Sequence, residues 1–247
     1  MLFDGGGAVY PQDTDPGREI VTPFLRSRGI HTIDVMVVSH TDADHLNGLL
    51  YVAQNFRVRE LWHSAAGVES PRAQRLLQFV QGGGGSIRTI ATLPKTQQRQ
   101  GVSIELLHPR PQGDVYYDEW SLNDNSVVMR LSLGKRSFVF PGDIGRDAEE
   151  IVAATLQTTD GFKAPHHGSS TSSSTMLLDT LDAKFVIISC GADNGFSFPH
   201  ADVLRRYDDY HLRVIRTDVE GMVSMHTDGR TWQIESHRGE SLQWPQL

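Results

Sequence analysis

One stretch decides how this chain is interpreted: IDVMVVSHTDADHLNGLLYVA, residues 33–53. Residues 33–38 are mostly apolar, which is typical of a buried strand. Residues 46–53 repeat apolar side chains at helical spacing and predict a helix. The polar segment 39–45 joins the two. Within its last six residues it carries four potential metal ligands, His40, Asp42, Asp44 and His45.

A strand-to-helix turn is a favourable place for such a cluster. It lies at the end of a sheet, where side chains converge on a crevice, and the first turn of the helix favours negative charge. The alternative is a polar loop in which Asp44 merely caps the helix. The density of histidine and aspartate favours a metal site over that alternative.

Three later polar clusters also follow predicted strands. Asp143 comes after an apolar stretch, His166 and His167 are adjacent after residues 162–164, and His200 opens a predicted helix after Ser197-Phe198-Pro199. If the sheets pack in register, histidines and aspartates from four loops converge on one edge. A two-metal hydrolytic site requires that convergence.

Helices and strands interleave along the whole chain, without a long linker or an internal repeat. This mixture predicts an α/β fold with two mixed sheets flanked by helices, in a single domain over residues 1–247. The abrupt start at Leu2-Phe3 suggests an excised fragment that lacks its first strand. Predicted helices cover 19–28, 45–54, 70–81, 147–157, 172–181 and 200–210. Predicted strands cover 33–38, 58–63, 87–91, 102–107, 126–133, 137–140, 162–164, 185–189, 213–216, 221–226 and 231–235.

Composition excludes several classes of protein. The 247 residues are 38% hydrophobic and 21% charged, as in an ordinary globular chain. The single cysteine, Cys190, excludes a disulfide framework and a zinc site built from several cysteines. No apolar run approaches the roughly 20 residues of a membrane-spanning helix, so we expect a soluble chain without a transmembrane segment. The net charge of -7 argues against a general polyanion binder, although bound metal could still attract phosphate.

The order of these motifs resembles the metallo-β-lactamase superfamily, whose signature is H-x-H-x-D-H followed by further His, Asp and His ligands. More narrowly, the chain looks like the C-terminal nuclease domain of the ComEC family of competence DNA-uptake channel proteins. That resemblance implies an αββα sandwich with the site along one edge. It rests on Asp4-Gly5-Gly6-Gly7, the 23–29 stretch, 40–45 with Asn47-Gly48, 123–126, Gly142-Asp143-Ile144, 166–169 and Arg216-Thr217-Asp218.

The resemblance also assigns metal ligands. His40 and Asp42 would hold one divalent ion, Asp44 and His45 the second, and Asp143 would bridge them. His200 would be the last ligand, although its role could be exchanged with that of His166 or His167. Asp42 stands where the broader signature has histidine, which favours Mn²⁺ while leaving Zn²⁺ possible. The superfamily's middle histidine is not evident, and its place falls near Asn123 or Asn125, or at His108.

The catalytic roles follow from the charges of the ions and carboxylates in this ligand set. Two divalent ions lower the pKa of a bridging water and stabilise charge on the phosphate. Asp44 or Asp143 would orient the resulting hydroxide, and His166 or His167 would protonate the leaving group. Candidate substrate contacts are Ser169, Ser170 and Asn125. Tyr116, Tyr117 and Trp120 are candidates for stacking on an unpaired base.

The function that this resemblance implies is a metal-dependent DNase that degrades the non-transported single strand during DNA uptake. The partners would be single-stranded DNA and the membrane channel domain of the parent protein. The place of action would be the extracytoplasmic face of the bacterial inner membrane. Two alternatives stay open: a phosphodiesterase or lactonase for small molecules, and a DNA-guiding domain that binds metal weakly.

Overall fold

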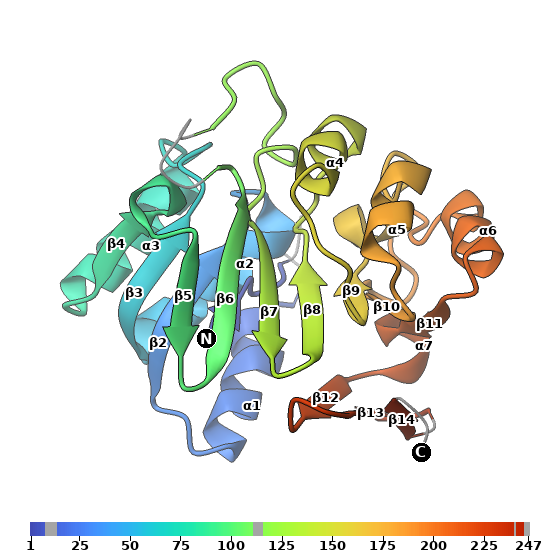
Figure 1. Ribbon diagram of the computed structural model, residues 1–247. Coiled ribbons are helices and arrows are strands. Elements are labelled where there is room, and N and C mark those ends of the chain that lie inside the picture. Colours follow the sequence, from blue (N-terminus) through green and yellow to red (C-terminus); the bar gives the residue numbers. More distant parts are fainter. Residues whose placement is uncertain (8–13, 111–115, 240, 245–247) are drawn as a thin grey trace. The chain divides into compact units, whose positions relative to one another are not determined.

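The computed structural model describes residues 1–7, 14–110, 116–239 and 241–244 (Figure 1). The chain forms two compact units, and each is built from two separate stretches of sequence. The first unit consists of Met1–Pro94 and Pro109–Val127. The second consists of Lys95–His108 and Val128–Leu247.

The first unit is built on a four-stranded sheet that is parallel throughout its described strands. Parallel neighbours need crossover connections, and helices supply them here. In spatial order the strands are β1 (Leu2–Phe3), β2 (Thr32–Val38), β3 (Arg57–His63) and β4 (Ser86–Thr89). The helical segments are η1 (Gly17–Val21), α1 (Thr22–Ser27), α2 (Ala43–Asn55), α3 (Pro71–Gly82) and the short η2 (Ile90–Thr92).

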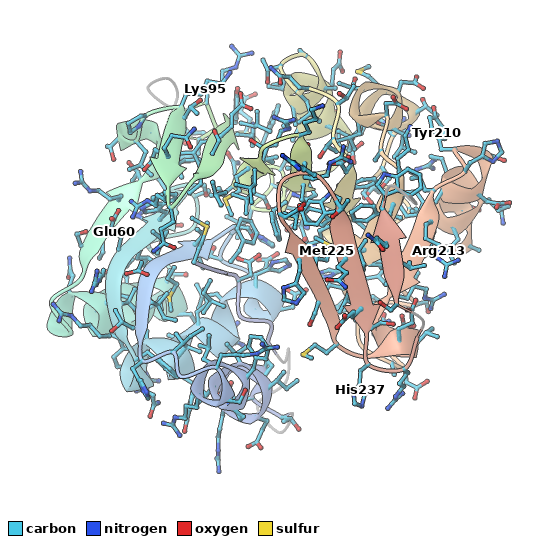
Figure 2. All side chains as sticks on the ribbon, turned by 60° about the horizontal axis from the view of Figure 1, so that its bottom comes forward. Glu60, Lys95, Tyr210, Arg213, Met225 and His237 are labelled. Atoms are coloured by element: carbon cyan, nitrogen blue, oxygen red, sulfur yellow. The ribbon has the colours of Figure 1, made fainter. Side chains whose placement is uncertain are left out.

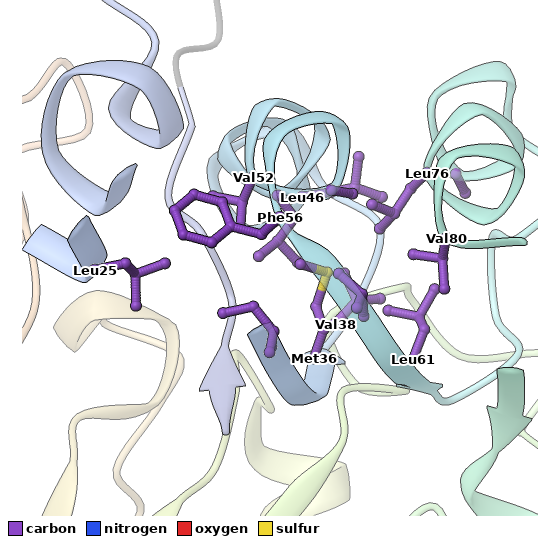
Figure 3. Close-up of a cluster of buried hydrophobic side chains, with 14 residues drawn as sticks. Leu25, Met36, Val38, Leu46, Val52, Phe56, Leu61, Leu76 and Val80 are labelled. Carbon is purple, nitrogen blue, oxygen red and sulfur yellow. The ribbon is translucent and has the colours of Figure 1, made fainter. Parts of the chain in front are cut away.

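The core of the first unit lies between this sheet and its helices (Figure 3). Met36 and Val38 of β2 and Leu61 of β3 are almost completely buried, as are Leu46 of α2 and Leu76 of α3. Burial of each such side chain is worth about 1.5–3 kcal/mol relative to leaving it exposed. This packing fixes the end of β2 and the start of α2, where the predicted metal ligands lie.

The second unit is built on a seven-stranded mixed sheet. Antiparallel pairing runs from β5 to β8, and parallel pairing runs from β8 to β11. In spatial order the strands are β11 (Arg213–Arg216), β10 (Phe185–Ile188), β9 (Gly161–Lys163), β8 (Arg136–Phe140), β7 (Val128–Leu133), β6 (Val102–His108) and β5 (Thr96–Arg99). The helical segments are α4 (Arg146–Ala153), η3 (Pro165–Gly168), α5 (Thr175–Leu181), α6 (Ala201–Asp209) and α7 (Thr217–Glu220).

A small antiparallel sheet completes the second unit. It contains β12 (Val223–Thr227), β13 (Trp232–Ser236) and β14 (Leu242–Trp244), and Figure 2 labels Met225 on it. Trp232 and Ile234 of β13 pack with residues of the seven-stranded sheet in one buried cluster. The sheet therefore adds to the hydrophobic core of this unit.

The predicted α/β class, with sheets and flanking helices, is confirmed. Two details differ: the four-stranded sheet is parallel rather than mixed, and β12 to β14 form a third sheet. The single domain over 1–247 stays a prediction. Within the described parts of the chain, no helix is both long enough and apolar enough to cross a lipid bilayer.

Glycines allow the segment after β1 to lie directly against helix α2. The Gly5 N–H donates to His45 O and the Gly48 N–H donates to Gly6 O, both at 2.9 Å. A Cβ added to Gly48 would overlap the carbonyl oxygen of Gly5, and one added to Gly17 would overlap that of Gly48. The backbones therefore approach too closely for any side chain.

We expect Gly48→Ala to destabilise the protein by about 1–3 kcal/mol, because the added methyl group would force these backbones apart. Gly82→Ala in α3 is the matched control, since a Cβ there meets nothing within 4 Å. Alanine is the better helix former, so the control is predicted to be neutral or more stable by up to about 1 kcal/mol. Urea unfolding measures both changes, and equal effects of the two substitutions would contradict this packing.

Candidate metal centre

The ligand cluster of the first unit spans the end of β2 and the first turn of α2. Asp42 is the N-cap residue of α2, yet its side chain makes no capping hydrogen bond and stays 44% exposed. Asp44 lies in the first helical turn. One oxygen of Asp44 and one nitrogen of His45 lie within 4.8 Å of each other. The capping role considered for Asp44 is therefore wrong, because the N-cap position lies two residues earlier, at Asp42.

The carboxylate of Asp4 holds this turn in place. One oxygen accepts a hydrogen bond from the Ser39 N–H at 2.7 Å. The other accepts from Ser39 Oγ and lies 2.7 Å from His45 Nδ1. Because a carboxylate only accepts, Nδ1 of His45 carries the proton and Nε2 keeps its lone pair. A carboxylate behind a metal-ligating histidine orients the imidazole in this way.

His40 is presented in a comparable way. Its side chain is 1% exposed, and its Nδ1 faces the hydroxyls of Ser39 at 3.0 Å and Ser126 at 3.3 Å. Its Nε2 lies 3.6 Å from Asp42 Oδ2. The imidazole rings of His40 and His45 are 4.2 Å apart, between centroids. Two imidazoles and two carboxylates of this turn therefore form a donor set that fits a divalent cation.

The cluster of the second unit centres on Asp143, which follows β8 and is 1% exposed. Its Oδ1 lies 3.2 Å from Lys163 Nζ, and its Oδ2 lies 3.2 Å from His167 Nε2. The ammonium of Lys163 also donates to the carbonyls of Gly142 and Ala164. Three acceptors thus match the three N–H groups of Lys163. The lysine therefore fixes Asp143 and the backbone just after β8 and β9.

His167 is held in an unusual backbone conformation. Both His166 (φ 45°) and His167 (φ 54°) have left-handed backbone angles, which cost about 1–3 kcal/mol for such residues and cluster at functional sites. His167 Nδ1 lies 2.6 Å from the carbonyl oxygen of Ser189, which can only accept. His167 Nε2 therefore faces Asp143 either with a second proton or with a lone pair. A divalent cation can take the place of a proton between these two atoms, and so this pair also fits a metal ion.

The remaining predicted residues occupy varied positions. His200 is the N-cap residue of α6, and its backbone N–H donates to Gly168 O. Asn125 is buried, and its amide bonds backbone atoms of Tyr117 and Ser121 in its own loop. Ser169 is buried, with its hydroxyl 3.1 Å from that of Thr171, whereas Ser170 is exposed. Substrate contacts by Asn125, Ser169 and Ser170 stay predictions.

The hydroxyl-rich segment after His167, residues 169–174, has a structural role. The buried carboxylate of Glu149 accepts hydrogen bonds from the backbone N–H groups of Ser173 and Ser174. Burial raises the pKa of Glu149. Arg206 donates to the carbonyls of Ser172 and Ser173, and Ser174 caps α5. Residues 172–174 are therefore held in place by Glu149 of α4 and Arg206 of α6.

Sequence analysis did not predict the structural roles of Asp4 and Lys163. Asp4 stands in the quoted Asp-Gly-Gly-Gly motif, but nothing in that motif indicates partners at Ser39 and His45. Lys163 lies in a predicted strand, where a single lysine is an ordinary surface residue. The parallel pairing of β8 with β9 is the feature that brings it near Asp143.

Comparison with known proteins decides the family. The model of the metallo-beta-lactamase superfamily matches residues 1–191. This chain belongs to the metallo-β-lactamase superfamily. The predicted superfamily and its α/β fold are thereby confirmed. Members of this superfamily are generally metal-dependent hydrolases, which agrees with the His and Asp donor sets of the two units.

Curated relatives place the chain among homologues of ComEC-like competence proteins. "ComE operon protein 3" of Bacillus subtilis is 27% identical over 93% of this chain and 30% of its own length. "Recombination protein 2" of Haemophilus influenzae is 27% identical over 91% and 26%, and "Competence protein ComA" of Neisseria gonorrhoeae is 25% identical over 90% and 28%. The chain thus spans less than a third of these relatives. Among solved structures, the metallo-beta-lactamase fold protein YhfI from Bacillus subtilis aligns with a TM-score of 0.45 and 11% identity, over 87% of this chain and 94% of that chain.

We expect Asp4→Asn to weaken Mn²⁺ binding about 10- to 100-fold, because the amide no longer provides the anionic acceptor that holds His45. Asp34→Asn is the control, since Asp34 is 59% exposed and pairs with Arg59 on the surface of the same unit. Isothermal titration with Mn²⁺ measures both variants. Unchanged affinity in Asp4→Asn would show that His45 needs no such support.

Buried His63, at the end of β3, predicts a pH dependence of stability. Burial lowers its pKa to about 4 from 6.5. The unfolded chain therefore binds the proton more readily, so stability from the neutral imidazole is complete above pH 6.5 and is lost as the pH falls towards 4. The loss attributable to His63 is about 2–3 kcal/mol by pH 4.5.

Urea unfolding in EDTA at pH 7 and pH 4.5 tests this effect. His63→Gln is expected to lose less stability than the wild type between the two pH values, by about 2–3 kcal/mol. His31→Gln, a change of an exposed histidine, is the control and should behave like the wild type. An equal loss in His63→Gln and the wild type would refute the assignment.

Proposed function

We propose that this chain is a metal-dependent phosphodiesterase that cleaves DNA, and that it degrades the single strand that is not transported during natural DNA uptake. One observation carries the proposal. In each unit the Nδ1 of a histidine is held by an acceptor, Asp4 for His45 and the Ser189 carbonyl for His167, which leaves Nε2 as the proposed ligand atom. The competence proteins that match more than 90% of the chain support DNA as the substrate.

The proposed ligands are those that the resemblance assigns, and we expect each of them to be needed for activity. His40 and Asp42 would hold one ion and Asp44 and His45 the other, with Asp143 serving both. The pairing of His167 with Asp143 supports His167 as the ligand from the 166–167 turn. His200 remains a proposed ligand. Carboxylate-rich donor sets favour Mn²⁺, and Zn²⁺ is the alternative.

When bound, the ions supply hydroxide at neutral pH and offset negative charge on the phosphate. The chain's own residues have separate tasks. Lys163 holds the carboxylate of Asp143 in place through its hydrogen bonds. Asp44 and Asp143 orient the attacking water. His166, from the same strained turn, is the proposed donor of the proton that the leaving oxygen needs, and His167 would take that task if it is not a ligand.

The setting of this activity is also proposed. The relatives are more than three times as long as the segment that this chain matches. We infer that the chain works as a part of a larger membrane protein, with a channel domain as its partner. Its site of action would be the extracytoplasmic face of the inner membrane, where incoming DNA is first accessible.

The direct test is cleavage of a labelled single-stranded oligonucleotide in Mn²⁺. Wild type is predicted to cleave it, and EDTA should abolish cleavage. Asp143→Asn should reduce the rate about a hundredfold or more, because charge stabilisation by a bound metal is worth several kcal/mol. Asp179→Asn, at an exposed residue of α5, is the matched control and should retain full activity.

Other outcomes would redirect the assignment. Cleavage of bis(p-nitrophenyl) phosphate without cleavage of any oligonucleotide would indicate a hydrolase for small molecules. A folded protein that binds no metal in millimolar Mn²⁺ but still binds DNA would indicate a DNA-guiding domain. Either result would overturn the proposed nuclease.

A further inference from the structure

Two phenylalanines, an exposed Phe196 and a half-buried Phe198, lie beside the histidines of the second unit. Phe196 is 58% exposed although one face of its ring stacks on Phe198, with centroids 5.5 Å apart and planes inclined by 17°. Phe198 in turn stacks on His167, with centroids 6.2 Å apart and planes inclined by 22°. The three rings therefore form a continuous stack that begins at the partner of Asp143 and ends in solvent.

The loop that carries this pair is held by its own hydrogen bonds. The side chain of Asn194 accepts from the Phe198 N–H at 2.9 Å and donates to the Phe198 carbonyl at 2.7 Å. It also donates to the carbonyl of Gly191 at 3.0 Å. A flat ring in a fixed loop loses little conformational entropy on binding, so the pair is preorganised.

The aromatic loop is also connected to the histidine turn. The His200 N–H donates to Gly168 O at 3.0 Å. Gly168 has a φ of 82°, and a Cβ there would press against Pro199. Phe198 makes edge contacts with His166 at 5.5 Å and His200 at 5.7 Å, between centroids. The position of the stack relative to His167 is therefore fixed by the backbone as well as by the rings.

The surroundings of Phe196 limit what can bind it. Its neighbours in the loop, Gly195 and Ser197, are exposed and either small or polar, as are residues 191–193. Docking sites for a lipid surface or a protein partner are typically marked by a contiguous apolar patch of several hundred Å². A single exposed ring that continues a stack is instead suited to one flat aromatic group.

We propose that Phe196 is a stacking platform for an unpaired nucleobase of the DNA strand whose phosphodiester is cleaved. This inference rests on the proposed function and deepens it. Base stacking on aromatic side chains tolerates any sequence, because every base has a π-face. In a duplex both faces of a base are covered by its neighbours, so the platform selects single strands. It also separates a nucleic acid from small diesters that carry no base.

The test is equilibrium binding in EDTA, where no cleavage occurs, measured by fluorescence anisotropy. The probes are a fluorescein-labelled 12-mer of thymidylate and a 12-mer of the same charge built from abasic residues. Phe196→Ala is expected to weaken binding of the thymidylate probe about 5- to 150-fold, since one stacking contact is worth about that factor. Its affinity for the abasic probe should match that of the wild type.

Two variants make this comparison specific. Phe196→Trp restores an aromatic face and should bind the thymidylate probe at least as tightly as the wild type. Phe24→Ala removes a 41% exposed phenylalanine from α1 in the first unit and should have no effect. Equal weakening of both probes by Phe196→Ala, or no weakening of either, would overturn the platform.

Cleavage in Mn²⁺ separates this inference from the proposed function. If the wild type cleaves the thymidylate 12-mer and Phe196→Ala binds and cleaves it equally well, the platform is wrong and the nuclease stands. If no variant cleaves but binding depends on Phe196 and on the base, the nuclease fails and the platform stands. If the wild type binds neither probe, the platform is refuted.

Discussion

The hydrogen bonds of the Asp4 carboxylate are the constraint on which the first unit depends. They join the end of β1 to Ser39 at the end of β2 and to His45 in the first turn of α2. The two sides of this turn are otherwise separate elements with their own packing. Hydrogen bonds to a charged group are each worth about 1.5–3 kcal/mol, more than most single contacts. The glycines around Asp4 follow from the same constraint, because a carboxylate that reaches His45 brings the backbone against α2.

In the second unit, other residues hold the candidate ligands in place. Asp4 accepts from a backbone N–H and a hydroxyl, whereas Asp143 accepts from the ammonium of Lys163, which holds one of its oxygens. The Ser189 carbonyl sets the proton of His167 in the way that Asp4 sets that of His45. In both units the choice of tautomer is made by a group on the side of the ring away from the candidate ligand atom. A preformed site of this kind requires little reorganisation when a cation binds.

The sequence predicted those parts of the fold that are determined locally. The apolar run 33–38 became β2, and the predicted helix 70–81 became α3, where the Ser70 hydroxyl accepts from the Ala73 N–H. β5 was missed because its four residues, Thr-Gln-Gln-Arg, are polar and carry no strand pattern. Helix α5 begins at Thr175 rather than 172, because contacts with Glu149 and Arg206 hold the preceding serines outside it.

The sequence predicted which residues are candidate ligands, but it did not predict which side chains contact one another in the site. The cluster of four ligands at 40–45 was evident, since all four lie in one turn. Asp4 is 35 residues from Ser39 and 41 from His45, and only the parallel pairing of β1 with β2 brings them together. The same applies to His167, which, like His166, was named only as an alternative to His200 for the last ligand. Its contact with Asp143 depends on backbone angles that the sequence does not encode in any short motif.

The most direct test of this account is the protonation state of His45 in solution. Long-range ¹⁵N–¹H correlation spectra of protein labelled at histidine report the tautomer of each ring, and His45→Gln identifies the His45 signal. The account predicts that Nδ1 of His45 carries the proton and that added Zn²⁺ shifts its Nε2 resonance while Nδ1 stays protonated. A proton on Nε2 in the metal-free protein, or a His45 spectrum that Zn²⁺ leaves unchanged, would contradict it.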